Sequence, residues 1–379
     1  MGSKRSLERM EALRGRLMEG MAANGITAEV GERIYAKLQA FADFGFPESH
    51  SFSFAYLVYA SAWLKVHHPE AFYAALLASQ PMGFYSPQTL LADARRHGVR
   101  ILAADVTASG VQPRVEPGAT PPGAVPTTPD GVPLVRPRAD LAVRLGLAQV
   151  RTIGEERAAE IVAEREREPF TSLADLSRRV PLTREQLEAL ATAGALRAWG
   201  SRRENLWSAG ALAHEHGVVH GTWLQPPLPG TAVGARPPAL PGMDVVEEAV
   251  ADVWATGVTP HTFPTRFVRP RLEASGVVAI AELERREPGE RLRVGGVVTH
   301  RQRPKTASGI TFLSLEDETG LLNVVCSVGL WQRYRRVART SAALVVRGTL
   351  ERADGVTNLV ADALEPLSLA VPSRSRDFR

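Results

Sequence analysis

The pattern with the clearest chemistry lies between Leu147 and Val162, around the triplet Thr152, Ile153 and Gly154. Gly154 is placed to open a helix, and a second short helix is expected before a tight turn. The first N–H groups of a helix have no partner within it, and the helix dipole adds partial positive charge there. Both favour a phosphate oxygen, so the triplet is a candidate phosphate site. An ordinary helical hairpin with a glycine turn is the alternative.

A second candidate site lies in the acid-free run from Arg291 to Lys305. The run holds these cationic side chains and one histidine: Arg291, Arg293, Arg301, Arg303, Lys305 and His300. Arg301, Arg303 and Lys305 are expected at the end of a strand and in its loop, and Phe312 follows on the next strand. Cations beside an aromatic face are typical of a groove for single-stranded nucleic acid. The alternative places Phe312 in a core and the cations in solvent.

The residue types give little support for a metal site or for a catalytic site. His50, His67 and His68 have no third ligand at workable spacing, and adjacent histidines point in different directions on a helix. The sequence contains no phosphate-binding glycine loop, nucleophile elbow or zinc-protease helix. No closely spaced pair of aspartates lies in a strand context fit for two magnesium ions. We therefore expect no metal, no cofactor and no catalytic residue in this chain.

Length and composition narrow the class of protein. The 379 residues, 44% of them hydrophobic, are enough for two or three domains. The single cysteine, Cys326, excludes an intrachain disulfide and a cysteine-based zinc site, and its strand context predicts a buried thiol. No apolar run is long enough to span a bilayer, and the residues from Met1 to Arg16 do not resemble a signal peptide. We expect a cytoplasmic protein without a membrane partner.

Two proline-rich stretches divide the chain. Eight prolines fall between Pro113 and Pro137, and six fall between Pro226 and Pro241, which favours exposed linkers. The expected organisation is a helical region at 1–112, a linker or loop insertion at 113–138, a helical hairpin region at 139–211, a linker with short helices at 212–287, a barrel at 288–369 and a tail at 370–379.

The residues before and between these stretches favour helices. Thr27 is placed to cap one helix, and Ser86 precedes a proline that suits the first position of another. Thr183 and Gln186 form a capping box, and Gly194 stands where a helix should end.

After the second stretch the apolar pattern changes to a period of two, which is typical of strands. Strands are expected at 292–298, 310–314, 322–326, 344–350 and 357–363, with a helix at 331–338. Three strands, a helix and two strands is the order of an OB-fold, a small Greek-key barrel. The expected fold class is therefore multi-domain α+β, with mainly α-helical N-terminal and central units followed by a β-barrel.

Several segments resemble known families. The segment Phe41-Ala-Asp-Phe-Gly-Phe-Pro-Glu-Ser-His-Ser-Phe-Ser-Phe-Ala-Tyr56 and the residues 63–72 resemble the fingers region of bacterial family C DNA polymerases, the alpha subunits of DNA polymerase III. Residues 80–88 and the stretch Asp93-Ala-Arg-Arg-His-Gly98 resemble the error-prone branch. The segment 147–162 resembles the helix-hairpin-helix motif, which binds the DNA backbone without regard to sequence.

This resemblance covers nearly the whole chain in the family's order, and it implies a function. The chain would be the DNA-binding C-terminal part of an error-prone DNA polymerase acting in damage-tolerant, translesion synthesis. The palm with its metal-binding carboxylates would lie upstream of Met1, so the chain alone is expected to be inactive. Magnesium is accordingly expected in the complete polymerase and not here.

The resemblance also implies roles for individual residues. Ser49 and His50 would lie near the nucleotide, although Glu48 stands where replicative relatives carry lysine. Thr152 stands where the hairpin motif has glycine. Thr152, Ile153 and Gly154 would hold duplex DNA, whereas Arg301, Arg303, Lys305 and Phe312 would hold a single strand. The implied partners are both forms of DNA, an incoming dNTP, and damage-tolerance accessory proteins or a sliding clamp reached through a partner.

Two other hypotheses stay open at this point. The chain could be a stand-alone, non-catalytic DNA-binding or interaction module of a DNA repair complex. A tRNA-binding accessory with an OB domain is the weaker alternative, because the fingers-like segment argues against it.

Overall fold

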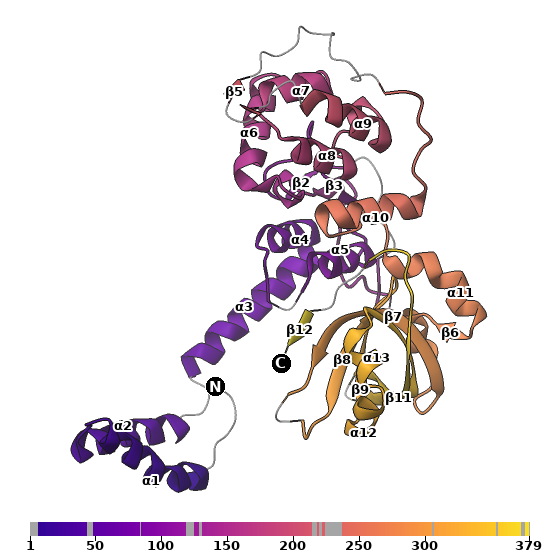
Figure 1. Ribbon diagram of the computed structural model, residues 1–379. Helices are drawn as coiled ribbons and strands as arrows, with labels where there is room; N and C mark the ends of the chain where they lie inside the picture. Colours follow the sequence, from indigo (N-terminus) through magenta and orange to yellow (C-terminus); the bar gives the residue numbers. More distant parts are fainter. Residues whose placement is uncertain are drawn as a thin grey trace. The chain divides into compact units, whose positions relative to one another are not determined.

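A computed structural model describes most of the chain in two compact units, Met1–Trp63 and Leu64–Arg379. The described residues are 7–43, 48–83, 85–118, 125–128, 131–213, 218–219, 222–223, 237–304, 307–353, 355–372 and 376–378. We call Leu64–Arg379 the main unit, and Figure 1 shows the order of its helices and strands.

The N-terminal unit is helical. Helices α1 (Leu7–Ala23) and α2 (Ala28–Asp43) pack against each other, and α3 (Glu48–His67) continues into the main unit. Helix α2 begins directly after Thr27, whose carbonyl accepts the Gly31 N–H at 2.9 Å, so the predicted helix start is confirmed. Phe52 and Tyr59 of α3 are exposed.

The main unit opens with helices α4 (Pro69–Ala78) and α5 (Pro87–Arg96). The predicted start of α5 is confirmed, because the Ser86 hydroxyl accepts the Thr89 N–H at 3.1 Å and proline follows it. A small sheet then forms in the order β1-β3-β2. Its strands are β1 (Ile101–Leu102), β2 (Arg114–Pro117) and β3 (Leu141–Arg144), so four residues of the expected linker at 113–138 form an edge strand.

Short helices surround the next part of the core. They are η1 (Leu147–Gln149), α6 (Gly154–Arg167), α7 (Leu173–Arg179), α8 (Arg184–Thr192), η2 (Arg197–Trp199) and α9 (Arg202–Leu212). The capping box of Thr183 and Gln186 is present at the start of α8. Gly194 follows that helix with φ +71°, a left-handed conformation that glycine adopts without strain.

Residues between this core and the barrel also fold into short elements. These are β4 (Val218–Val219), β5 (Thr222–Trp223), α10 (Val245–Thr256), η4 (Pro264–Val268), α11 (Arg269–Ala274), β6 (Val277–Val278) and η5 (Ile280–Arg285). Asp244 caps α10, accepting the N–H groups of Val246 and Glu247 at 2.8 Å each.

The C-terminal part forms the expected barrel. Its elements are β7 (Arg291–Gln302), β8 (Thr311–Glu316), β9 (Leu321–Cys326), α12 (Val328–Arg333), α13 (Arg335–Thr340), β10 (Ala343–Ala353) and β11 (Val356–Pro366). Antiparallel pairs β7–β8 and β8–β9, the parallel pair β9–β11 and the antiparallel pairs β11–β10 and β10–β7 close the ring (Figure 1). This confirms the OB-fold order, with two helices where one was expected. Strand β12 (Arg376–Phe378) adds to β7 in parallel.

Alternation along the strands fills the barrel. Leu313, Leu315 and Val324 are buried in one core cluster with Cys326, whose burial raises the pKa of the thiol to about 12. The predicted burial of Cys326 is therefore confirmed. Phe312 is not a member of this cluster, because it points to the opposite face of β8.

A buried carboxylate on that opposite face joins the barrel to α5. Glu316 has no exposed surface. Its two oxygens accept the Thr89 hydroxyl and the Arg96 Nη1 at 3.0 Å each. Burial raises the pKa of Glu316 to about 7, although Arg96 and Thr89 favour the charged form.

This carboxylate predicts a pH dependence of stability. Because folding raises the pKa of Glu316 from 4.5 to about 7, the folded state binds its proton more tightly. The free energy of unfolding should therefore fall as pH rises from about 4.5 to 7, by roughly 2–3 kcal/mol. Glu316→Gln should remove this slope in thermal melts at several pH values. Glu365→Gln, at an exposed carboxylate, is the control, and equal slopes in all three proteins would contradict the assignment.

Candidate nucleic-acid interface

The predicted phosphate site forms a tight turn between η1 and α6. Thr152 has φ +66° and Gly154 has φ +65°, so two residues of the turn are left-handed. The expected first helix is a single 3-10 turn, which is a correction to the predicted pair of short helices. Helix α6 begins at Gly154, as predicted. Left-handed backbone explains why the hairpin motif has glycine where this chain has Thr152.

The turn presents both backbone and side chains to solvent, since Thr152 and Gly154 are exposed and only Ile153 is buried. Ile153 is only 4% exposed and its N–H donates to the Val150 carbonyl at 3.1 Å, so this N–H is already bonded. The first N–H groups of α6 start at Gly154, where an added Cβ would meet nothing within 4 Å. A phosphate can therefore approach the start of α6 closely. Exposed Glu155 and Glu156 follow at once and oppose an anion there.

Neighbouring elements brace the turn on two sides. The Gln186 amide of the α8 capping box donates to the Thr152 carbonyl at 3.1 Å. The Arg151 N–H donates to the Ala255 carbonyl of α10 at 2.7 Å. The turn is thus held by α8 and α10 together, which fixes the orientation of the N–H groups at its tip.

Sequence reasoning missed a cation–aromatic pair beside this turn. The Arg151 guanidinium lies 4.9 Å from the centre of the Trp254 ring, and Trp254 is 48% exposed. Trp254 belongs to α10, inside the stretch at 212–287 that was expected to be a linker with short helices. An arginine stacked on an exposed tryptophan presents both charge and a flat apolar face. No local signal in the sequence could have found it, because Arg151 and Trp254 come from distant segments.

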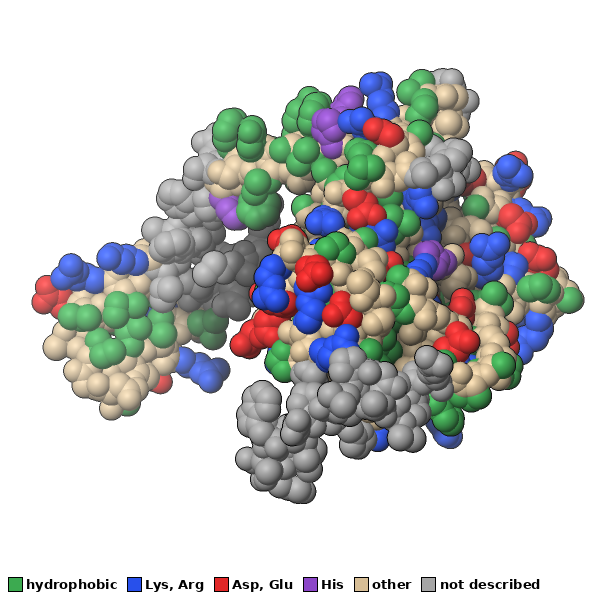
Figure 2. All heavy atoms as spheres, turned by 90° about the horizontal axis from the view of Figure 1, so that it is seen from above, with side chains coloured by type: hydrophobic (Ala, Val, Ile, Leu, Met, Phe, Trp, Pro, Cys, Tyr) green, Lys and Arg blue, Asp and Glu red, His purple; other side chains and the backbone are tan. Residues whose placement is uncertain are grey.

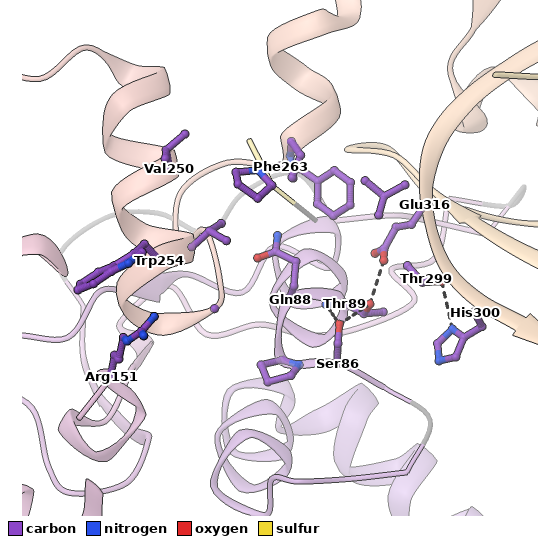
Figure 3. A pocket seen from close by; sticks show the side chains of 16 residues that line it. Ser86, Gln88, Thr89, Arg151, Val250, Trp254, Phe263, Thr299, His300 and Glu316 are labelled. Atoms are coloured by element: carbon purple, nitrogen blue, oxygen red, sulfur yellow. Dashed lines mark hydrogen bonds between the residues drawn. The ribbon is translucent and has the colours of Figure 1, made fainter. Parts of the chain in front are cut away.

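A cavity of about 680 Å³ connects this pair to the barrel (Figure 3). Arg151 and Trp254 line one side of it, and Thr299 and His300 of β7 line another. The capped start of α5, with Gln88, lies between them. Residues next to the hairpin turn and residues of the barrel therefore share one surface.

The stretch Asp93–Gly98 makes contacts that join α5 to neighbouring helices and to the barrel. Burial opposes the charge of Asp93, but His97 and Lys65 hold its pKa below the usual range. Lys65 and the Tyr73 hydroxyl donate to the same oxygen of Asp93 at 2.8 and 2.7 Å. Arg96 of this stretch reaches Glu316 on the barrel, so the motif has a structural use in joining helices to barrel.

The barrel brings only some of the predicted single-strand residues together. Arg303 is exposed in the β7–β8 loop, and Lys305 lies outside the described residues. Phe312 is half-buried on the outer face, where it pairs across the strands with Gln302. Arg301 is only 7% exposed, and its Nε donates to the Ala338 carbonyl at 2.7 Å. The guanidinium of Arg301 therefore supports α13 and does not face a groove.

The start of the cationic run is also engaged within the protein. Arg291 pairs with Asp362 at 2.7 Å, and Arg293 pairs with Glu365 at 2.9 Å. Figure 2 shows basic and acidic side chains mixed over the face that it presents. Net charge is thus a poor guide to the interface, and the unpaired cations are more informative.

The predicted nucleotide-proximal residues lie on α3. His50 is exposed, and its ring packs edge-on against Phe54 with centroids 4.4 Å apart. Ser49 belongs to the same helix, and its side chain lies outside the described residues. Because these residues belong to the N-terminal unit, their role stays a prediction.

Within the described part of the chain, no three His, Cys, Asp or Glu side chains come together as a metal site. No helix in the described ranges is both long enough and apolar enough to cross a membrane.

The turn and the barrel together define a nucleic-acid-binding class of protein. A family model described as a helix-hairpin-helix motif matches residues 98–206, and one described as an OB-fold nucleic acid binding domain matches residues 292–367. The hairpin match begins earlier than the expected boundary at residue 139, because it includes the small β-sheet.

Curated relatives named error-prone DNA polymerase match this chain along its whole length, which confirms the predicted resemblance. The relative from Nocardia farcinica is 53% identical over 390 residues, and that from Mycobacterium tuberculosis is 52% identical over 382 residues. Both alignments cover 100% of this chain and 32% of the relative. The chain thus spans about a third of the length of these relatives. A solved asparaginyl-tRNA synthetase from Pyrococcus horikoshii, 20% identical over 24% of this chain and 23% of its own, has a TM-score of 0.21. That score supports no inference.

The left-handed turn predicts opposite effects for two substitutions. Thr152→Gly should raise the free energy of unfolding by about 0.5–1 kcal/mol, because a β-branched residue is strained at positive φ. Gly154→Ala should lower it by about 1–2 kcal/mol for the same reason. Urea denaturation measures both.

A glycine without this constraint provides the control. Gly329 in α12 also has open space around its Cβ position, but its φ is not positive. Gly329→Ala should be neutral or stabilising, since alanine favours helix. Destabilisation by Thr152→Gly would show that the turn is not left-handed at this residue.

Proposed function

We propose that this chain is the DNA-gripping part of an error-prone DNA polymerase that acts in damage-tolerant synthesis. The observation that carries the proposal is the shared cavity, which Arg151 beside the hairpin turn and His300 of the barrel both line. A turn suited to duplex phosphate and a barrel suited to single strand would then act on one DNA substrate, near the junction of its two forms.

Duplex DNA would bind at the start of α6. The N–H groups from Gly154 onward are available there, and the turn is braced by Gln186 and Ala255. Backbone N–H groups at a helix start contact phosphate oxygens and read no base, so this grip would be independent of sequence. Such independence suits a polymerase that must travel along its template.

The single-stranded template would cross the outer face of the barrel. Arg303 supplies charge in the β7–β8 loop, and half-buried Phe312 supplies a stacking surface beside it. Lys305 is proposed to add a second cation to the loop. Arg301 is excluded from direct contact, because its guanidinium is bound to α13. Charge together with an aromatic face is what non-specific single-strand binding needs.

Nucleotidyl transfer from an incoming dNTP, with magnesium, is proposed for the part of the polymerase that this chain does not span. Ser49 and His50 would lie near that nucleotide as part of the fingers. The chain alone is expected not to extend a primer. We also propose the domain boundaries given in the sequence analysis and a cytoplasmic location. Accessory proteins or a sliding clamp are proposed as further partners.

Charge reversal in the β7–β8 loop tests the single-strand site. Arg303→Glu should weaken binding to an unstructured oligonucleotide by roughly 10-fold and reduce the slope of log K against log salt, since a phosphate contact is lost. Duplex affinity should change by less than about 2-fold. Fluorescence anisotropy at several salt concentrations measures both.

A matched control lies on β7, the strand that leads into this loop. Arg293→Glu changes the charge equally, but Arg293 is engaged with Glu365, so single-strand affinity should stay near that of the parent protein. Equal losses in both variants, or equal losses on duplex and single strand, would contradict the assignment of Arg303.

A further inference from the structure

Four exposed arginines form a ridge on the helices between β9 and β10. They are Arg333 at the end of α12, and Arg335, Arg336 and Arg339 on α13. Positions three and four apart lie on one face of a helix, so Arg335 and Arg336 both adjoin Arg339. The other faces pack on the barrel, where Ala338 is buried and Trp331 is partly buried. The arginine ridge is therefore the solvent face of these helices.

No carboxylate is close to the arginine ridge in the sequence. The chain has no Asp or Glu from Thr319 to Leu350. Among the residues that the structure describes, none of the four arginines forms an ion pair, whereas Arg291, Arg293 and Arg347 on the barrel strands all do. The ridge therefore differs from these three arginines of the barrel strands.

The ridge lies at the same end of the barrel as the β7–β8 loop. Thr311, which follows the loop, pairs with Cys326, which precedes α12. A Cβ added to Gly309 in the loop would stand 3.1 Å from Cγ2 of Val328 and 3.4 Å from Nη2 of Arg303. Loop and helices are therefore neighbours in space.

Hydrogen bonds from Arg301 make a second connection between the end of strand β7, next to the loop, and helix α13. Its guanidinium donates to the carbonyls of Ala338 and Ser341, at the end of α13 that carries Arg339. Arg303 follows two residues later on the same strand end. The buried Arg301 guanidinium therefore ties the strand end beside the loop to the end of α13.

We propose that the arginine ridge is a second phosphate-binding surface, which takes the segment of single strand that leaves the β7–β8 loop. The proposal rests on the function proposed above for Arg303 and Phe312. An acidic protein segment would also suit the charge of the ridge. Single-stranded DNA is favoured because the helices that carry the ridge adjoin the loop assigned to that ligand. The bound strand would then be longer than the outer face alone can hold, within the roughly 4–16 nucleotides that OB-folds cover.

The test compares two triple variants on oligonucleotides of two lengths. The ridge variant is Arg335→Gln, Arg336→Gln and Arg339→Gln, and the control is Arg291→Gln, Arg293→Gln and Arg347→Gln. Each removes three positive charges from the same barrel, at exposed positions except for half-buried Arg293. Affinities for oligo-dT of about 6 and about 16 nucleotides are measured over a range of salt, with thermal melts to verify folding.

The ridge variant should lose roughly 10-fold or more on the long oligonucleotide and less than about 3-fold on the short one. Its salt slope on the long oligonucleotide should fall by about 2, since about 0.7 is lost for each phosphate contact on single strands. The control should match the parent protein on both lengths.

Three results would overturn the inference. The ridge variant could bind the long oligonucleotide as the parent protein does, or it could lose equally on both lengths. It could also bind DNA normally while losing affinity for polyglutamate, which would point to an acidic protein partner. Failure of the proposed function itself is distinguishable, because the parent protein would then bind neither oligonucleotide or would be insensitive to Arg303→Glu.

Discussion

The buried carboxylate of Glu316 is the contact on which the arrangement of the main unit depends. It lies on the outer face of the barrel and holds Thr89 and Arg96 of α5 at 3.0 Å each. Arg269 at the start of α11 makes a second contact with the barrel, donating to the Asp317 carboxylate at 2.7 Å. An ionisable group without exposed surface is costly unless hydrogen bonds satisfy it, so these partners must stay in place. Thr89 and Glu316 also line the cavity between the hairpin turn and the barrel.

The arginines that the structure describes fall into two groups, those bound within the protein and those exposed without a carboxylate partner. Most of those that the structure describes hold carboxylates or carbonyls and maintain the fold, as Arg96, Arg269 and Arg301 do. Arg303 and the arginine ridge keep their charge for solvent or a ligand. The proposed interface is therefore defined by which cations lack a carboxylate and not by how many there are. This explains how a chain with a net charge of only +4 can present local surfaces for a polyanion.

Local signals in the sequence predicted most of the fold. The caps at Ser86 and Thr183 and the strand–helix–strand order of the barrel follow from short-range rules of hydrogen bonding and alternation. The single-strand contact predicted for Arg301 disagrees with its burial. The guanidinium is buried against α13, which lies far along the chain, so no local signal could show this. Glu316 and the Arg151–Trp254 pair were missed for the same reason, since their partners come from distant segments. The arginine ridge was also missed, because only the barrel register shows that the helices carrying it adjoin the β7–β8 loop.

Hydrogen exchange measured by mass spectrometry tests the division of labour between turn and barrel most directly. The chain would be followed alone, with a short blunt duplex, and with oligo-dT. The account predicts that duplex slows exchange of the amides at residues 152–156 and that oligo-dT slows those at residues 302–313. Absence of protection at both segments, or the same protection by both ligands, would contradict it.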